Sequence, residues 1–226
     1  MLTSRSLLAA GLMTLVLASP VMAAKKTNAD AKQGKATPAA AAVDAVATAH
    51  RLVRYGDARK DALSLITAAQ MLKQAGSTAA EFKRAEGKAG EAKDKPELLS
   101  VDAILARAKT YASGNPALVA LAEDVAKDGA RGASGGPKTS RSVVSGHSRD
   151  VYTLRFEGGE PARVFVSGDG DSDLDLYVYD ENGNEICKDV DSTDDMICTW
   201  RPRWTGEFRI VIKNLGVANL YRIWTN

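Results

Sequence analysis

The sequence predicts two units in one chain: an Ala-rich α-helical bundle, or a set of paired helical hairpins, followed by an antiparallel β-sandwich. Three observations predict this fold. Apolar residues between positions 39 and 128 recur every three or four places, whereas those beyond position 142 alternate. Charge divides at the same place: residues 1–141 carry 21 Lys and Arg against 13 acids, and residues 142–226 carry 9 against 15. The two parts are therefore analysed separately.

The composition excludes several classes of protein. The chain has 226 residues, of which 45% are hydrophobic and 26% charged, as in an ordinary globular protein rather than a fibrous or wholly disordered one. The formal net charge is only +2. A nucleic-acid partner is therefore not expected, because such proteins concentrate basic charge.

Residues 1–23 have the composition of a secretory signal peptide. Arg5 supplies the positive charge, an apolar run follows, and Ser19-Pro20 and Val21-Met22-Ala23 supply the break and the small residues of a cleavage site. The alternative, a membrane anchor, requires an apolar run about twice as long. We therefore expect an exported protein, periplasmic or secreted, with no membrane span in the mature chain.

The helical unit is expected over residues 39–128, after a flexible leader at 24–38 that has no large apolar residue. Two helices with apolar stripes should turn at Gly56-Asp57, and Gly76 should end the second. Residues 77–96 are expected to form a partly helical, solvated connection. Two more helices should follow, the second with Asn115 at its N-cap and Pro116 at its first position.

Residues 129–141 are rich in glycine and are expected to form a linker. Beyond them, the sandwich is expected over residues 142–226. Its predicted strands cover residues 151–156, 162–166, 174–179, 196–200, 208–212 and 220–225. Asn182-Gly183 predicts a two-residue hairpin turn with positive φ at both positions, which sets Cys187 opposite Val178.

Cys187 and Cys198 are the two cysteines of the chain. In an oxidising compartment an even pair at this spacing predicts a disulfide. Two buried thiols packed as small hydrophobic groups are the alternative.

Acidic residues dominate the segment between Asp169 and Asp195, which holds eleven acids and one base, Lys188. The predicted hairpin brings two acidic groups to one end, where the carboxylates repel each other unless a cation intervenes. Hard oxygen ligands suit Ca²⁺. The expected calcium ligands are Asp169, Asp171, Asp173, Asp189, Asp191 and Asp194. A solvated acidic loop is the alternative.

The strand at 174–179 also predicts a binding face. Alternation puts Leu174, Leu176 and Val178 toward the core and Asp175, Tyr177 and Tyr179 on the opposite face. The tyrosines suit either an exposed binding surface or cross-strand packing.

Three segments carry a resemblance to a known family. They are Gly168-Asp169-Gly170-Asp171-Ser172-Asp173-Leu174-Asp175-Leu176-Tyr177-Val178-Tyr179-Asp180, Trp200-Arg201-Pro202 with the strand at 206–214, and Asn219-Leu220-Tyr221-Arg222-Ile223. Together they resemble the bacterial pre-peptidase C-terminal domains over residues 143–226. The resemblance implies a jelly-roll-like sandwich related to the collagen-binding domains of clostridial collagenases, some of which bind calcium. The chain departs from the pattern because no peptidase precedes the domain and because of the Cys187–Cys198 pair.

The sequence has no HExxH, P-loop or dinucleotide fingerprint, and no GxSxG elbow between a predicted strand and a predicted helix. His50 lies on an apolar helical stripe, where a hydrogen-bonded core histidine is the expectation. We therefore expect a non-catalytic exported accessory or binding protein whose calcium-stabilised sandwich contacts a protein, peptide or glycan. The alternatives are a structural or stress-related envelope protein without a discrete ligand, and an accessory or remnant module of a secreted peptidase system.

The opposite charges of the two halves allow them to attract each other, although physiological salt screens exposed charges beyond about 8–10 Å. Solvated faces on two separate units are the expectation, and docking of the basic half on the acidic half is the alternative.

Overall fold

A computed structural model describes residues 26–87, 90–91, 99–128 and 136–226. The predicted signal peptide at 1–23 lies outside these residues. None of the helices in the described part of the chain has the length and apolar character needed to cross a bilayer.

Four helices form the predicted Ala-rich helical part: α1 (Pro38–Arg59), α2 (Ala62–Ala75), α3 (Val101–Tyr111) and α4 (Pro116–Lys127). Side-chain caps define their starts. Thr37, Asp61, Ser100 and Asn115 each accept hydrogen bonds from backbone N–H groups of the first turn. The predicted Asn115-Pro116 start and the predicted end at Gly76, which adopts φ +61°, are both confirmed.

The turn between α1 and α2 was predicted at the wrong place. Helix α1 continues through Gly56-Asp57 to Arg59, and its C-cap, Lys60, takes the left-handed conformation (φ 55°). Gly56 serves packing instead of a turn, because a Cβ atom there would lie 3.0 Å from Leu65 Cδ2 on α2. The absent side chain lets the two helices approach closely.

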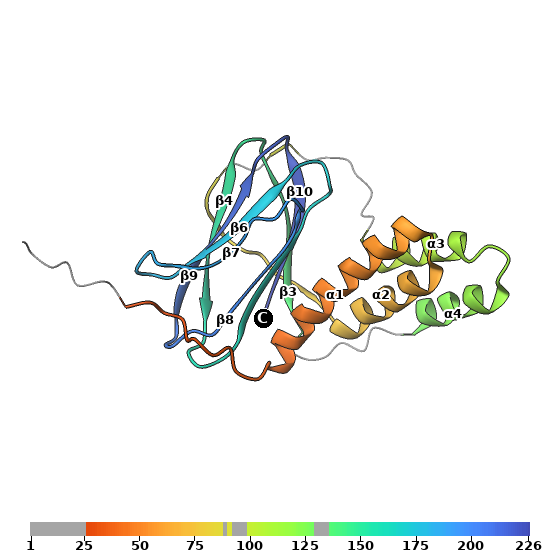
Figure 1. The fold of residues 1–226 in the computed structure, drawn as a ribbon, viewed down its shortest axis with the longest axis horizontal. Helices are drawn as coiled ribbons and strands as arrows, with labels where there is room; N and C mark the ends of the chain where they lie inside the picture. Colours follow the sequence, from red (N-terminus) through yellow and green to blue (C-terminus); the bar gives the residue numbers. More distant parts are fainter. Residues whose placement is uncertain (1–25, 88–89, 92–98, 129–135) are drawn as a thin grey trace, which may run out of the picture.

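Two five-stranded sheets face each other as a sandwich, with helices α2–α4 to one side of it (Figure 1). Sheet A has the order β1-β3-β10-β5-β8, and sheet B the order β2-β4-β9-β6-β7. All pairings except the parallel β1–β3 pair are antiparallel. The strands are β1 (Thr78–Ala79), β2 (Arg84–Glu86), β3 (Lys138–Val144), β4 (Arg149–Phe156), β5 (Ala162–Ser167), β6 (Leu174–Tyr179), β7 (Glu185–Asp189), β8 (Asp195–Trp200), β9 (Gly206–Asn214) and β10 (Asn219–Thr225).

All six predicted strands are present, as β4, β5, β6, β8, β9 and β10. The domain limits differ from those expected. Residues 78–86, expected in a solvated connection, add β1 to sheet A and β2 to sheet B. Strand β3 begins at Lys138, inside the expected linker. Strands β1 and β2 were not predicted because they are too short to show alternation and depend on pairing with distant strands.

The leader expected to be flexible instead packs on the sandwich from Lys26 onward. Asn28 is fully buried, and its amide is hydrogen-bonded on both sides. Its oxygen accepts from the N–H groups of Arg203 (2.9 Å) and Trp204 (3.1 Å), and its NH₂ group donates to the carbonyl of Trp204 (3.1 Å). Its backbone N–H donates to Asp180 (2.9 Å). The absence of large apolar residues hid this attachment, because it is polar.

The β6–β7 hairpin has the predicted strand register but a different turn. Cys187 lies opposite Val178, as expected. At the turn, Gly183 alone adopts a positive φ (+82°), and its N–H donates to the carbonyl of Asp180 (3.0 Å). Tyr179 then pairs with Glu185 across a bulge. The Asp180 carboxylate accepts from the N–H groups of Asn182 and Asn184, which favours this wider turn over the two-residue form.

Helix α1 connects the two halves, since it packs partly on the other helices and partly on sheet A. Its first half presents Val43, Val46 and Ala47 to Phe165 and Trp224 of sheet A. Its second half joins the helical core. Two separate solvated units were the expectation, and the structure instead contains an apolar interface between them.

Candidate functional site

One row of sheet A carries four polar side chains across four strands. Arg141 on β3 lies opposite Arg222 on β10, Arg222 lies opposite Ser167 on β5, and Ser167 lies opposite Asp195 on β8. Directly opposed residues point to the same face of a sheet. That face is the one toward α1, because Trp224, two residues after Arg222, packs against the helix.

Helix α1 places His50 and Arg54, one turn apart, against this row. His50 Nδ1 lies 3.1 Å from Ser167 Oγ. The guanidinium of Arg54 reaches two carboxylates, with Nη2 at 2.6 Å from Asp194 Oδ1 and Nε at 2.5 Å from Asp195 Oδ2. Both carboxylates are less than a tenth exposed, which makes Arg54 the cation that offsets their charge.

A cleft of about 940 Å³ opens between the helices and sheet A beside these contacts. Helices α1, α2 and α3 form one wall, and β3, β10 and the loop after β5 form the other. Among the described residues that line it, cations outnumber acids. The cations are Arg54, Lys73, Arg107, Arg141 and Arg222, and the carboxylates are Asp57 and Asp169. Between them lie apolar and aromatic side chains, among them Leu72, Leu99, Val101, Tyr111, Leu220 and Trp224.

The His50–Ser167 pair resembles a catalytic base and nucleophile, but its surroundings do not suit that chemistry. Burial lowers the pKa of His50 to about 4, with the positive charges of Arg54 and Arg222 acting in the same direction and Asp195 opposing. Such an imidazole is a weak base near neutral pH. His50 also packs edge-on against Phe165 and Trp224, with ring centroids 5.1 Å and 4.8 Å away. It is the hydrogen-bonded core histidine that its apolar stripe predicted.

The backbone N–H groups that follow Ser167 already donate hydrogen bonds. The N–H groups of Gly168 and Gly170 donate to the carbonyl (2.8 Å) and the carboxylate (2.5 Å) of Asp194. They therefore do not form an oxyanion hole above Ser167.

The predicted calcium ligands lie at one end of the sandwich, but several are already engaged. Asp194 binds Arg54, Asp189 accepts from the N–H of Ile197 (2.9 Å), and Asp191 accepts from Thr193. No group of three or more His, Cys, Asp or Glu in the described ranges is arranged to hold a metal ion.

Carboxylates nevertheless crowd at this end of the sandwich. Burial raises the pKa of Asp173, and the charges of Asp175, Asp191 and Asp194 add to that shift. Asp169 and Asp171 belong to the same loop, where the N–H of Asp171 donates to Asp169 (3.2 Å). Calcium binding stays a prediction.

The predicted binding face forms part of the outer side of sheet B. Leu174, Leu176 and Val178 are fully buried, so Tyr177 and Tyr179 point outward, with ring centroids 6.3 Å apart and planes 14° apart. Asp175 differs from the expectation, since it is 5% exposed. It accepts a hydrogen bond from Tyr177 (3.3 Å) and lies near Lys213 (3.9 Å), so these neighbours cover its carboxylate on that face.

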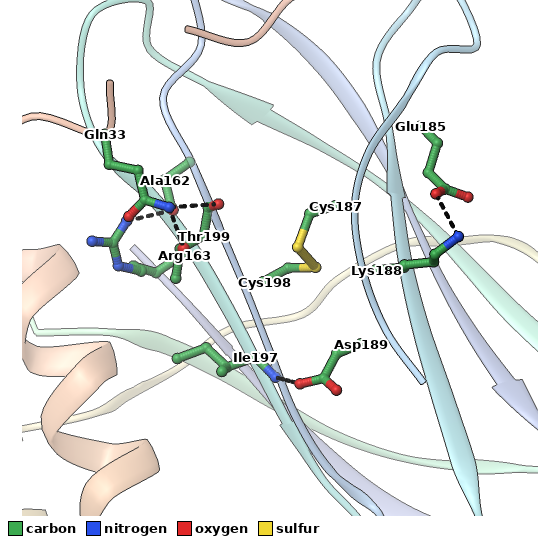
Figure 2. The surroundings of a disulfide bond; sticks show 10 residues. All are labelled: Gln33, Ala162, Arg163, Glu185, Cys187, Lys188, Asp189, Ile197, Cys198 and Thr199. Carbon is green, nitrogen blue, oxygen red and sulfur yellow. Dashed lines mark hydrogen bonds and ion pairs between the residues drawn. A yellow bond between two sulfur atoms is a disulfide. The ribbon is translucent and has the colours of Figure 1, made fainter. Parts of the chain in front are cut away.

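The Cys187–Cys198 disulfide is present, as predicted, and joins the two sheets (Figure 2). Cys187 lies on β7 and Cys198 on β8, which are the last strands of sheets B and A. Beside it, Asp189 binds the backbone of Ile197, and Gln33 of the N-terminal segment donates to Thr199 (Figure 2). The bond therefore closes the sandwich along the edge that leads to the acidic end.

The cleft itself was missed by sequence reasoning, because the two halves were analysed as separate units. One signal did exist: the basic helical half and the acidic sandwich carry charges of opposite sign. The ion pairs of Arg54 with Asp194 and Asp195 follow that polarity. The pair of Arg163 with Asp44 (3.1 Å) also joins the halves, with the base on the sandwich and the acid on α1.

Comparison with known proteins identifies no family. No family model and no curated protein matches the chain. Among solved structures, PliG of Aeromonas hydrophila, a periplasmic inhibitor of g-type lysozyme, is 15% identical over 40% of this chain and 84% of that one, with a TM-score of 0.31. A de novo designed double-stranded β-helix is 15% identical over 39% of this chain and 97% of that one, with a TM-score of 0.27. Likenesses this weak carry no argument here about fold or function.

Proposed function

We propose that this is an exported, non-catalytic binding protein that holds a small ligand in the cleft between its helices and sheet A. The observation that carries the proposal is the cleft itself. Its volume of about 940 Å³ lies in the range of ligand sites, and its walls combine apolar side chains with a few charged ones. Such sites occur where two structural units meet.

Export is supported by the disulfide and by the signal-peptide pattern of residues 1–23. A non-catalytic role is supported by the low pKa of His50 and by the engaged amides of Gly168 and Gly170.

The test uses the mature chain and the neutral fluorescent probe N-phenyl-1-naphthylamine. We expect saturable binding that is lost in Ser77→Trp, which places an indole at an exposed position of the cleft lining. Ser113→Trp is the matched control, because Ser113 is exposed and does not line the cleft. Absence of saturable binding to the mature chain, or unchanged binding to Ser77→Trp, would overturn the proposal.

The outer face of sheet B is a second candidate surface, for a protein, peptide or glycan. The observation that favours it is the pair of parallel rings of Tyr177 and Tyr179, with the guanidinium of Arg209 5.1 Å from the Tyr179 ring. Flat aromatic faces of this kind bind other flat or extended groups. Glycan and peptide arrays should lose signal on Tyr177→Ala and Tyr179→Ala. Thr153→Ala, an exposed substitution on the same face, should retain the signal.

Membership of the pre-peptidase C-terminal family, and the jelly-roll-like strand order that it implies, are likewise proposals that rest on the sequence segments quoted above. If neither surface binds a ligand, the structural or stress-related role becomes the better account. An accessory role in a secreted peptidase system remains a further proposal of the resemblance.

A further inference from the structure

Two arginines stand directly opposite each other in the wall of the cleft. Arg141 on β3 and Arg222 on β10 are cross-strand partners that both line it. Opposed residues in an antiparallel pair hold their Cβ atoms about 4.5–5.5 Å apart, and like charges at that distance are destabilising. An anion bound between the two guanidiniums would relieve that repulsion.

Further positive charge surrounds this pair. Lys73 of α2 and Arg107 of α3 line the same cleft. Ser100, the N-cap of α3, lines it as well, so the positive end of the α3 dipole lies at its border.

Two acids lie among the described residues of the lining. Asp57 is bound by Arg107 (3.0 Å) and accepts a hydrogen bond from Tyr111 (3.0 Å). Asp169 is the other carboxylate, and it lies in the loop after β5. Among the described residues of the lining, cations thus outnumber acids, and Arg141 and Arg222 are the two that lie opposite each other on neighbouring strands.

The remainder of the lining is apolar. Leu72, Leu99, Val101 and Leu220 are partly exposed and line the cleft together with Trp224. A small inorganic anion would leave these side chains in contact with water. A molecule with both an anionic group and an apolar body would cover them and also neutralise the arginines.

We propose that the cleft binds an amphiphilic anion, with its carboxylate or phosphoryl oxygens bridging Arg141 and Arg222 and its apolar body against the leucines and Trp224. The inference rests on the proposed function, because it concerns the same cleft. The planar guanidiniums of arginine suit the anionic group of such a ligand, since each presents two N–H groups to a carboxylate or phosphate.

The test compares two probes with the same aromatic body: 8-anilino-1-naphthalenesulfonate, which is an anion, and N-phenyl-1-naphthylamine, which is neutral. On the mature chain we expect Arg141→Gln and Arg222→Gln each to weaken binding of the anion roughly tenfold or more, because each removes a charged hydrogen-bond donor. Binding of the neutral probe should stay within about twofold. Arg155→Gln, which removes one exposed charge on β4 outside the cleft lining, should leave the binding of both probes unchanged.

The outcomes separate the two proposals. Equal affinities of the anion for the mature chain and for both cleft variants would overturn the anion site while the neutral probe still reports the cleft. Loss of both probes in Arg141→Gln would overturn it too, if the variant melts at the normal temperature. We expect that melting temperature to be unchanged or higher, since the substitution relieves a like-charge pair.

Competition by simple amphiphiles below their micelle concentrations identifies the head group. Dodecanoate, dodecyl phosphate or both should displace the anionic probe, which distinguishes a carboxylate from a phosphoryl ligand. Dodecanol, the neutral analogue, should displace it at least tenfold less effectively. Equal displacement by dodecanol would overturn the requirement for an anion.

Discussion

At the scale of single residues, buried ionisable groups contribute to the stability of the fold. His50 is 2% exposed and lies between two aromatic rings and a serine. Inside the sandwich, Asp150 is fully buried and is held by Arg84 (3.0 Å) and the hydroxyl of Tyr221 (2.7 Å). Each of these groups ties together segments that are far apart in the sequence.

Acid should weaken the folded state through His50. Its pKa is about 4 when folded against 6.5 when unfolded, so the unfolded chain binds the proton more tightly. The contribution of His50 is therefore fully present above pH 6.5 and is lost as the pH falls toward 4. This contribution of His50 to the free energy of unfolding is roughly 3 kcal/mol. Urea unfolding of the wild type and of His50→Gln between pH 4 and 7.5 should show a steeper loss for the wild type. Parallel curves would contradict this prediction.

Removing Arg84 should destabilise the sandwich strongly. Burial raises the pKa of Asp150, although Tyr221 and Arg84 favour its charged form. Arg84→Met leaves the buried carboxylate without its cation and should cost about 3–5 kcal/mol in the free energy of unfolding. The double variant Arg84→Met/Asp150→Asn should recover part of that loss. A loss below 1 kcal/mol in the single variant would show that the ion pair contributes little.

At the scale of elements, sequence pattern predicted the long, locally encoded segments and missed those that depend on distant partners. The strands β4 to β6 and β8 to β10 alternate or are rich in β-branched and aromatic residues, and the caps of α2 and α4 follow from Gly76 and Asn115-Pro116. By contrast, β1 and β2 are two and three residues long and exist only as edge strands of the two sheets. The attachment of Asn28 is made of hydrogen bonds alone, which leave no periodic signal.

The same distinction applies to the candidate sites. Alternation in β6 predicted which way Tyr177 and Tyr179 point, because period-two patterning is local. The Arg141–Arg222 pair depends on the register of β3 against β10, whose residues are about eighty positions apart in the chain. No local pattern contains that information.

Calcium should raise the melting temperature if the acidic end binds it. One oxygen of Asp173 is buried and accepts no hydrogen bond among the described residues, and neighbouring carboxylates surround it. At a hundred times its dissociation constant, the ion adds about 2.7 kcal/mol to the free energy of unfolding. For a chain of this length, that raises the melting temperature by roughly 5–10 °C. The measurement is a melt of the mature chain in millimolar Ca²⁺ against chelator.

Asp171→Asn/Asp173→Asn should abolish the calcium effect, whereas Glu207→Gln, on a strand of sheet B, should leave it intact. Coincident wild-type melting curves with and without calcium would leave the acidic end as solvated surface, with Arg54 as its cation.

At the scale of the whole molecule, the chain crosses between its two parts several times. The N-terminal segment lies on the sandwich, and α1 and α2 follow it in the helical part. The chain then returns to the sandwich, where β1 adds to sheet A and β2 to sheet B. It goes back to the helical part for α3 and α4 before the strands from β3 onward. Arg54 and Arg163 then bind the helices to sheet A through ion pairs. Helices and sandwich are consequently expected to unfold together, as one cooperative unit.

A chain that starts at residue 142 should therefore be much less stable than the mature chain. It lacks β1, β2 and most of β3, which leaves β10 as an edge strand, and it lacks α1, which exposes Trp224. It also removes Arg84 from the buried Asp150, which alone costs about 3–5 kcal/mol, or roughly 15 °C or more for a domain of this size. Near-ultraviolet circular dichroism, which reports on the packed tryptophans, should show a weak, non-cooperative transition for residues 142–226 and a sharp one for the mature chain. A sharp transition at the same temperature in both would mean that the sandwich folds independently and that the helices only rest upon it.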